Sequence, residues 1–132
     1  LGAVMWDLVC MARTKESLNE ALEKIPQIKE KFWNDLNLQG TENNLNKSLE
    51  NAARLADFIE LGELMALDAY DREESCGAHF REEYQTSEGE PLRNDEKYAY
   101  VSAWEYVPDS VSILHKEDLN YEHVEMTQRN YK

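Results

Sequence analysis

The spacing of hydrophobic positions in this chain changes from a helical period to alternation late in the sequence. From residue 14 to residue 38, apolar residues recur every three or four positions, as on one face of an amphipathic helix. That face consists of Leu18, Leu22, Ile25, Ile28 or Lys29, and Phe32. Thr14 suits the N-cap of this helix, Pro26 is expected to kink it or to begin a new turn, and Gly40 follows its end.

A second helical pattern extends from about residue 45 to Arg72, after candidate N-caps at 41–44. It carries two apolar stripes, which indicate two packing partners. One stripe is Leu45, Leu49, Ala52, Ala56, Ile59, Ala66 and Tyr70, and the other is Leu55, Phe58, Gly62, Met65 and Ala69. The preceding helix is one expected partner, in an antiparallel pair. The other is either the C-terminal tail or part of a larger protein, unless this is the central helix of a small bundle.

The segment 1–11 is apolar on most of its faces, which predicts a short buried helix. Because the chain begins within an apolar run and without methionine, we interpret it as a fragment of a larger protein. The missing neighbour is then expected to cover this segment and one stripe of the 45–70 helix. In isolation, the same surface is expected to self-associate through Val4, Trp6 and Leu8.

Residues 98–107 alternate between polar and apolar and are rich in aromatic and β-branched side chains. A turn pattern with Pro108 follows at 107–110, and 111–115 is predicted to return as a second strand. A lone hairpin is marginally stable in water, so this one is expected to lie on another element. The segment 121–132 is polar and is expected to be extended.

The formal net charge of −13 comes from 27 acidic residues against 14 lysines and arginines. This balance disfavours nucleic acid and anionic membranes as partners, since each requires a basic face. The sequence has no apolar run of the roughly 18 residues that a membrane span requires. Cys10 and Cys76 are interpreted as reduced thiols.

Between the two patterns, the segment 71–95 is dense in charge. Its three cations apart from His79 are all arginine: Arg72, Arg81 and Arg93. Arginine suits bidentate pairing with carboxylates where water is scarce. Gly77 is a candidate for a left-handed helix cap.

We find two interpretations of the polar pair His79 and Arg81. A cation and an imidazole two positions apart can bind a dicarboxylate. Alternatively, and as the preferred hypothesis, Arg81 pairs with Glu74 or Glu82 and fixes this segment to the helices. Its removal is then expected to leave Glu74, Glu82 or Glu83 without a partner. No spacing of histidines and cysteines suits a metal, and no glycine-rich loop suits a nucleotide phosphate, so no catalytic, cofactor-binding or metal-binding residue is predicted.

The segment 74–95 resembles the E-S-R-G-A-H-x-R-x-D-[YF]-P…R-D-D motif of the flavoprotein subunit of succinate dehydrogenase and fumarate reductase. The matching residues, which we take as structural, are Glu74, Ser75, Gly77, His79, Arg81, Glu82, Arg93 and Asp95. Cys76, Glu83 and Gln85 depart from the motif, and the spacing before Arg93 is longer. These departures are interpreted as those of a sub-branch of the family.

The resemblance implies the C-terminal domain of an FAD-dependent oxidoreductase that interconverts succinate and fumarate. In that family, the covalently bound FAD and the catalytic residues lie upstream, so the fragment itself is expected to be inactive and without cofactor. The implied partners are the flavin-binding domain of the same chain and an iron–sulfur subunit, without nucleic acid or direct membrane insertion. The implied location is cytoplasmic, at the inner face of the membrane through partner subunits.

Periodicity and resemblance together predict an all-α fold, a spectrin-repeat-like three-helix bundle with a C-terminal β-hairpin and extended tail. The expected divisions are a helical bundle over 1–72, the Arg/Glu-rich motif loop over 73–96, and the hairpin with its tail over 97–132. Two other functions remain open: a free-standing acidic helical module that binds a partner protein, and the C-terminal part of an L-aspartate oxidase.

Overall fold

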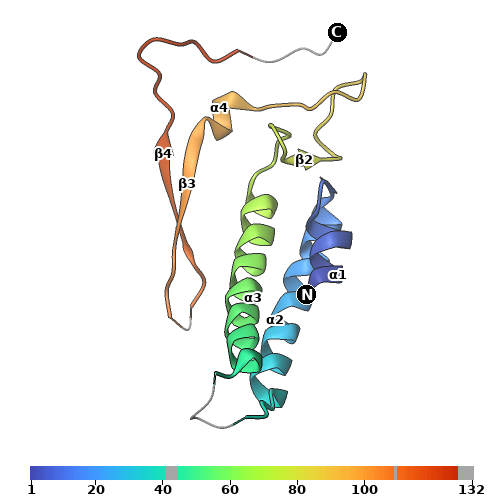
Figure 1. The fold of residues 1–132 in the computed structure, drawn as a ribbon. Coiled ribbons are helices and arrows are strands. Elements are labelled where there is room, and N and C mark those ends of the chain that lie inside the picture. The colour runs from blue at the N-terminus through green and yellow to red at the C-terminus, as the bar shows by residue number, and fades with distance from the viewer. Residues whose placement is uncertain (41–44, 109, 128–132) are drawn as a thin grey trace.

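The computed structural model describes residues 1–40, 45–108 and 110–127. Two long helices lie side by side and antiparallel, a short N-terminal helical segment lies against them, and a β-hairpin stands on the other side of α3 (Figure 1). The elements in chain order are α1 (Gly2–Val4), the π-helix η1 (Met5–Val9), β1 (Ala12–Arg13), α2 (Lys15–Asp35), α3 (Lys47–Asp71), β2 (Phe80–Arg81), α4 (Asp95–Tyr98), β3 (Tyr100–Glu105) and β4 (Ile113–Asp118).

Helix α2 begins as its sequence predicts. The Thr14 hydroxyl accepts a hydrogen bond from the Ser17 amide at 3.0 Å, and the Ser17 hydroxyl accepts one from the Thr14 amide at 3.0 Å. This reciprocal capping box satisfies two of the amides that a helix leaves unpaired at its start. The helix continues through Pro26 and ends at Asp35, with Leu36 as its C-cap.

Helix α3 ends as predicted at Arg72, which is its C-cap. The N-caps predicted at 41–44 lie outside the described residues; the observed N-cap is Asn46, whose side chain accepts from the amides of Ser48 and Leu49 at 3.1 Å. The two long helices bury a shared core, as their facing stripes predict. It consists of Val9, Leu18, Ala21, Ile25, Ile59, Ala66 and Ala69.

The N-terminal segment covers part of α3. Gly62 allows this approach, because a Cβ atom there would lie 3.1 Å from the Met5 sulfur. The predicted self-association surface is therefore wrong in part: Val4 and Leu8 pack against the chain's own core, while Trp6 remains 75% exposed.

The second apolar stripe of α3 divides between covered and uncovered positions. Gly62 and Ala69 are buried, whereas Leu55, Phe58 and Met65 are 40%, 57% and 52% exposed. Leu61, one position from the stripe, is also exposed. One face of α3 therefore presents large apolar side chains that no part of the described chain covers.

The described strands form two small sheets. β1 pairs with β2 in parallel, with Arg13 opposite Arg81. β3 pairs with β4 in an antiparallel hairpin that places Trp104 opposite Leu114, which confirms the predicted hairpin. Asp109, within the predicted turn, lies outside the described residues.

The predicted all-α three-helix bundle is wrong. The described residues form a mixed fold of four α-helical segments, one π-helix and two two-stranded sheets. The N-terminal segment is too short to act as a third bundle helix, because its helical structure ends at Val9 and the chain then becomes extended. In place of a three-helix bundle, the long helices α2 and α3 form an antiparallel pair, and the short segment α1–η1 packs against them.

Replacing Thr14 by alanine removes the capping box and should lower the free energy of unfolding by about 1 kcal/mol. Urea unfolding followed by circular dichroism measures this change. The control is Ser87→Ala, at an exposed turn position, which should remain within about 0.5 kcal/mol of the wild type. Equal midpoints for the two variants would contradict the importance of the cap.

Candidate functional site

The motif segment folds over the end of the helix pair where α2 begins and α3 ends (Figure 1). Ser75 holds its two halves together: the Ser75 hydroxyl accepts from the Arg81 amide at 2.9 Å and donates to the Arg81 carbonyl at 3.0 Å. Between them, Cys76 and His79 exchange backbone hydrogen bonds of 2.8 and 3.0 Å. Gly77 allows this tight turn at φ +60°; it does not cap a helix as predicted.

Arg81 closes the C-terminal end of α3. Its side chain is buried, at 1% exposure, and its Nη1 donates to the carbonyls of Ala69 at 3.0 Å and Tyr70 at 3.3 Å. The guanidinium also lies 5.5 Å from the centre of the Tyr84 ring. A cation here satisfies carbonyls that the helix leaves unpaired and complements the negative end of its dipole.

Glu83 joins the same arginine to the start of α2. It accepts from Arg81 Nε at 3.3 Å through one oxygen and from the Lys15 amide through the other. Burial acts to raise the pKa of Glu83, but the hydrogen bonds from Lys15 and Arg81 hold that pKa below its ordinary value. We call this arrangement of Arg81 and Glu83 the helix-end bridge: a cation at the end of α3 and an anion at the start of α2, each complementing a helix dipole.

The preferred partners of Arg81, Glu74 and Glu82, are therefore wrong, whereas Glu83, also expected to lose a partner without Arg81, is the carboxylate that it contacts. The predicted role of Arg81 in fixing the segment to the helices agrees with these contacts. Glu74 pairs with Arg72, and the exposed Glu82 makes a backbone hydrogen bond to Arg13. Glu83 is the carboxylate that pairs with Arg81. The Ser75 hydroxyl fixes the backbone of strand β2 at Arg81, and the Nε of Arg81 then lies beside Glu83.

Glu74 and Arg72 form a second contact set, which holds the start of the hairpin. Glu74 is buried, and its two oxygens accept from Arg72 Nη1 at 2.8 Å and from the Asn94 amide at 2.7 Å. Arg72 Nη2 donates to the Tyr100 carbonyl at 3.1 Å, and its guanidinium lies over the rings of Tyr98 and Tyr100.

Arg93 and Asp95 form a third set, at the C-terminal tail. Two guanidinium nitrogens of Arg93 donate to one oxygen of Asp95 at 2.9 and 2.6 Å, and this contact raises the pKa of Arg93. Its remaining Nη1 donates to the Thr127 carbonyl at 3.1 Å. Each of the three arginines in the segment thus connects it to a different element.

His79 lies beside these arginines. Its Nε2 is 2.9 Å from the Arg72 carbonyl, a contact in which the ring nitrogen must donate. Burial lowers the pKa of His79, and the positive charges of Arg13, Arg81 and Arg72 lower it further. The neutral tautomer with the proton on Nε2 therefore suits this position near physiological pH.

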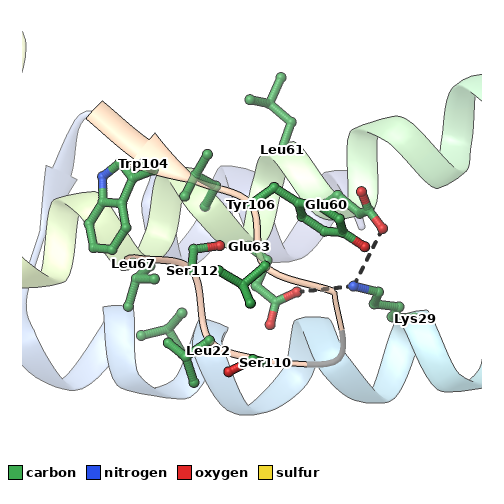
Figure 2. Close-up of a pocket in the computed structure, with 13 residues that line it drawn as sticks. Leu22, Lys29, Glu60, Leu61, Glu63, Leu67, Trp104, Tyr106, Ser110 and Ser112 are labelled. Atoms are coloured by element: carbon green, nitrogen blue, oxygen red, sulfur yellow. Dashed lines mark ion pairs between the residues drawn. The ribbon is translucent and has the colours of Figure 1, made fainter. Parts of the chain in front are cut away.

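A groove of about 900 Å³ lies between the hairpin and the helix pair (Figure 2). Leu22, Leu61 and Leu67 line it from the helices, and Tyr106 lies on the hairpin side. Lys29 pairs with Glu60 and Glu63 at 3.6 and 3.7 Å within it. The groove is apolar between polar edges and offers no convergent set of reactive groups.

Several contacts that build this region were not predicted from the sequence. Asn94 lies inside the motif segment and was not singled out, and Arg72 was named without the contacts that it makes here; its position at a predicted helix end was a usable signal. Trp104 donates from Nε1 to Asp68 at 2.7 Å and holds the hairpin to α3. Nothing in the sequence pairs those two positions.

Among the described residues, no group of three or more histidine, cysteine, aspartate or glutamate side chains is arranged to hold a metal ion. No helix in those same ranges has the length and hydropathy needed to cross a membrane. Cys10 and Cys76 form no disulfide.

Replacing Arg81 by alanine should lower the free energy of unfolding by about 3 kcal/mol, because it leaves the end of α3 and Glu83 without their partner. Arg81→Lys should recover part of this loss, since one ammonium cannot reach both sets of acceptors. Urea unfolding measures both. Arg54→Ala is the control, at an exposed arginine paired with Glu50, and should cost less than about 1 kcal/mol. An Arg81→Ala variant as stable as this control would refute the role of the bridge.

The depressed pKa of His79 predicts acid sensitivity. The unfolded chain takes up a proton at about 6.5, whereas the folded chain takes it up only at lower pH. The contribution of neutral His79 to the free energy of unfolding is therefore complete above pH 6.5. It is lost as the pH falls from 6.5 through the lower pKa of His79 in the folded chain. Unfolding free energies of wild type and His79→Gln should converge as the pH falls through this window. A constant difference across the same range would contradict a depressed pKa.

Comparison with known proteins identifies relatives of this chain. Residues 1–131 match the family model described as the fumarate reductase flavoprotein C-terminus. The chain is 25% identical over 132 residues to the succinate dehydrogenase flavoprotein subunit of Bacillus subtilis, covering 99% of this chain and 21% of that protein. It is 32% identical over 84 residues to one of the subunits of the fumarate reductase (CoM/CoB) of Methanothermobacter marburgensis, covering 64% of this chain and 15% of that one.

Solved structures agree on the fold. The FrdA chain of Escherichia coli quinol fumarate reductase, in a mutated form, superposes with a TM-score of 0.83 at 24% identity, covering 96% of this chain and 21% of that chain. A quinol-fumarate reductase with menaquinol molecules gives a TM-score of 0.80 at 24% identity, covering 94% and 21%. This chain thus spans about a fifth of these relatives or less. It belongs to the family of C-terminal domains of succinate dehydrogenase and fumarate reductase flavoprotein subunits.

Proposed function

We propose that this chain is the C-terminal part of a flavoprotein subunit that interconverts succinate and fumarate with FAD and passes electrons to an iron–sulfur subunit. The observation that carries the proposal is the family match over residues 1–131. The names of the Bacillus and Methanothermobacter relatives, one from a succinate dehydrogenase and one from a fumarate reductase, support the reaction.

Within that protein, we assign this chain a structural role. Arg81, the candidate for a dicarboxylate ligand, is buried and already donates to the end of α3 and to Glu83. Arg72 and Arg93 are likewise occupied by Glu74 and Asp95. These contacts support the interpretation that the motif residues position the helix pair, the hairpin and the tail, and that the reaction takes place elsewhere in the parent.

The residues of this chain do not fit FAD. Its five glycines are scattered at 2, 40, 62, 77 and 89, so none forms the glycine-rich loop that holds a nucleotide pyrophosphate. The described residues also lack a cleft with convergent phosphate-binding donors. We therefore assign the FAD to the rest of the parent flavoprotein.

The uncovered face of α3 supports a contact with that larger part. Leu55, Phe58 and Met65 are large, apolar and 40% to 57% exposed on one side of the helix. Large contiguous apolar patches on a protein surface mark sites of association. We propose that the flavin-binding domain covers this face, and that the iron–sulfur subunit, with its membrane partners, associates with the resulting flavoprotein.

Co-expression of this chain with the preceding part of its flavoprotein tests the proposal. The two parts should co-purify with FAD, while this chain purified alone should carry none. Phe58→Asp should reduce co-purification at least about tenfold, the effect of losing a buried interface anchor, while the isolated variant melts like the wild type. Leu45→Asp is the control, because it adds the same charge at an apolar residue that is 98% exposed and lies outside the stripe of Leu55, Phe58 and Met65.

Two outcomes would contradict the proposal. One is FAD bound to the isolated chain. The other is a complex that forms equally well with wild type and Phe58→Asp.

A further inference from the structure

Arg13 differs from the three arginines of the motif segment, because no acceptor satisfies it. Its Nε is buried, and within 1–40, 45–108 and 110–127 that atom has no hydrogen-bond partner. Its guanidinium also makes no ion pair in those ranges. Burial lowers the pKa of Arg13, and the nearby Cys10 and Asp68 offset this effect only in part. Buried donors without acceptors are rare in folded proteins and call for an explanation.

The position of Arg13 adds repulsion between like charges to its missing hydrogen-bond acceptor. Arg13 lies directly opposite Arg81 in the β1–β2 ladder, so two like charges face each other across paired strands. Such pairs are destabilising unless an anion lies between or beside them. The donors of Arg81 are used by the end of α3 and by Glu83, and Glu83 is shared with the Lys15 amide.

The carboxylate of Asp68 does not supply the acceptor that Arg13 lacks. It acts on Arg13 electrostatically, but it lies beyond ion-pair distance and accepts the indole N–H of Trp104 at 2.7 Å. The positive charge of Arg81 lowers the pKa of Arg13 further, and Arg13 in turn lowers the pKa of His79. A local excess of positive charge therefore exists in a chain whose net charge is −13.

We propose that Arg13 is the recognition site for a carboxylate that comes from a second molecule or domain. A guanidinium presents Nε and one Nη side by side, which matches the two oxygens of a carboxylate. A single negative charge suits the site better than a phosphate dianion, because Asp68 and the acidic chain around it repel a second charge. Arg13 as a residue is only half-buried, so an incoming carboxylate first meets the Nη groups, and the buried Nε joins the contact when the side chain turns outward.

This carboxylate has two possible sources, a free small carboxylic acid or an aspartate or glutamate side chain of an associated protein. Both would complete the same contact, and binding experiments distinguish them. The second source rests on the proposed function, since the associated protein would be the preceding part of the flavoprotein.

The first arm titrates the ¹⁵N-labelled chain with sodium acetate and follows the Nε–H resonances of its arginines by NMR. Sodium chloride at matched ionic strength corrects for general screening, and sodium phosphate tests the preference for carboxylate. A free-acid site predicts a saturable shift of the Arg13 resonance with acetate. The Arg54 resonance is the internal control, because that exposed arginine already pairs with Glu50 at 2.6 Å.

The second arm measures the affinity of the chain for the preceding part of the flavoprotein. A side-chain source predicts that Arg13→Gln weakens binding about tenfold or more, the usual effect of losing one charged hydrogen bond. Arg54→Gln should leave it unchanged. Arg13→Lys keeps the positive charge but lacks the paired N–H donors of a guanidinium, so its loss of affinity should lie between those of the wild type and Arg13→Gln. Thermal melting of each variant confirms that it is folded.

Either a saturable acetate response at Arg13 or a specific loss of affinity in Arg13→Gln supports the site. If acetate gives no response and Arg13→Gln binds the preceding part like the wild type, the site is refuted. If acetate gives no response and even the wild-type chain fails to bind the preceding part, both the site and the proposed function fail. An acetate response without binding of that part sustains the site and counts against the proposed function alone.

Discussion

The helix-end bridge between Arg81 and Glu83 is the interaction on which the rest of this structure depends. Antiparallel pairing brings the positive start of α2 and the negative end of α3 to the same end of the molecule. Arg81 donates to the carbonyls of α3, and Glu83 accepts from the first amide of α2. Because the backbone of Arg81 also exchanges two hydrogen bonds with the Ser75 hydroxyl, the bridge fixes the path of the motif segment.

From that fixed segment, the other arginines extend to separate elements. Arg72 reaches the first residue of β3 and Arg93 reaches the tail, each paired with a carboxylate close in sequence. Forked guanidinium groups can make an ion pair and a carbonyl contact at the same time, which a lysine does less well. This explains why a segment in a strongly acidic chain uses arginine at all three positions, and it gives the family motif a physical basis.

Sequence alone predicted those features that depend on local patterns. The cap at Thr14, the end of α3 at Arg72 and the hairpin all followed from residue type and spacing. The all-α bundle failed, because nothing local shows that helical structure stops at Val9 or that Arg13 pairs with Arg81 far along the chain. The sequence did not decide which neighbouring carboxylate pairs with Arg81, and it favoured Glu74 or Glu82 over the observed Glu83. Glu74, Glu82 and Glu83 are all close to Arg81 in sequence, but Glu74 is engaged by Arg72 and Asn94, and Glu83 is the carboxylate that meets the guanidinium.

Amide hydrogen exchange in Arg81→Lys tests most directly whether the bridge links both helix ends. If it does, the amides of the last turn of α3, the first turn of α2 and the Cys76–His79 turn should lose protection together, as one cooperative unit. Amides near Ile25, in the middle of α2, should keep theirs. Loss of protection confined to the residues beside position 81, with both helix ends unchanged, would contradict this account.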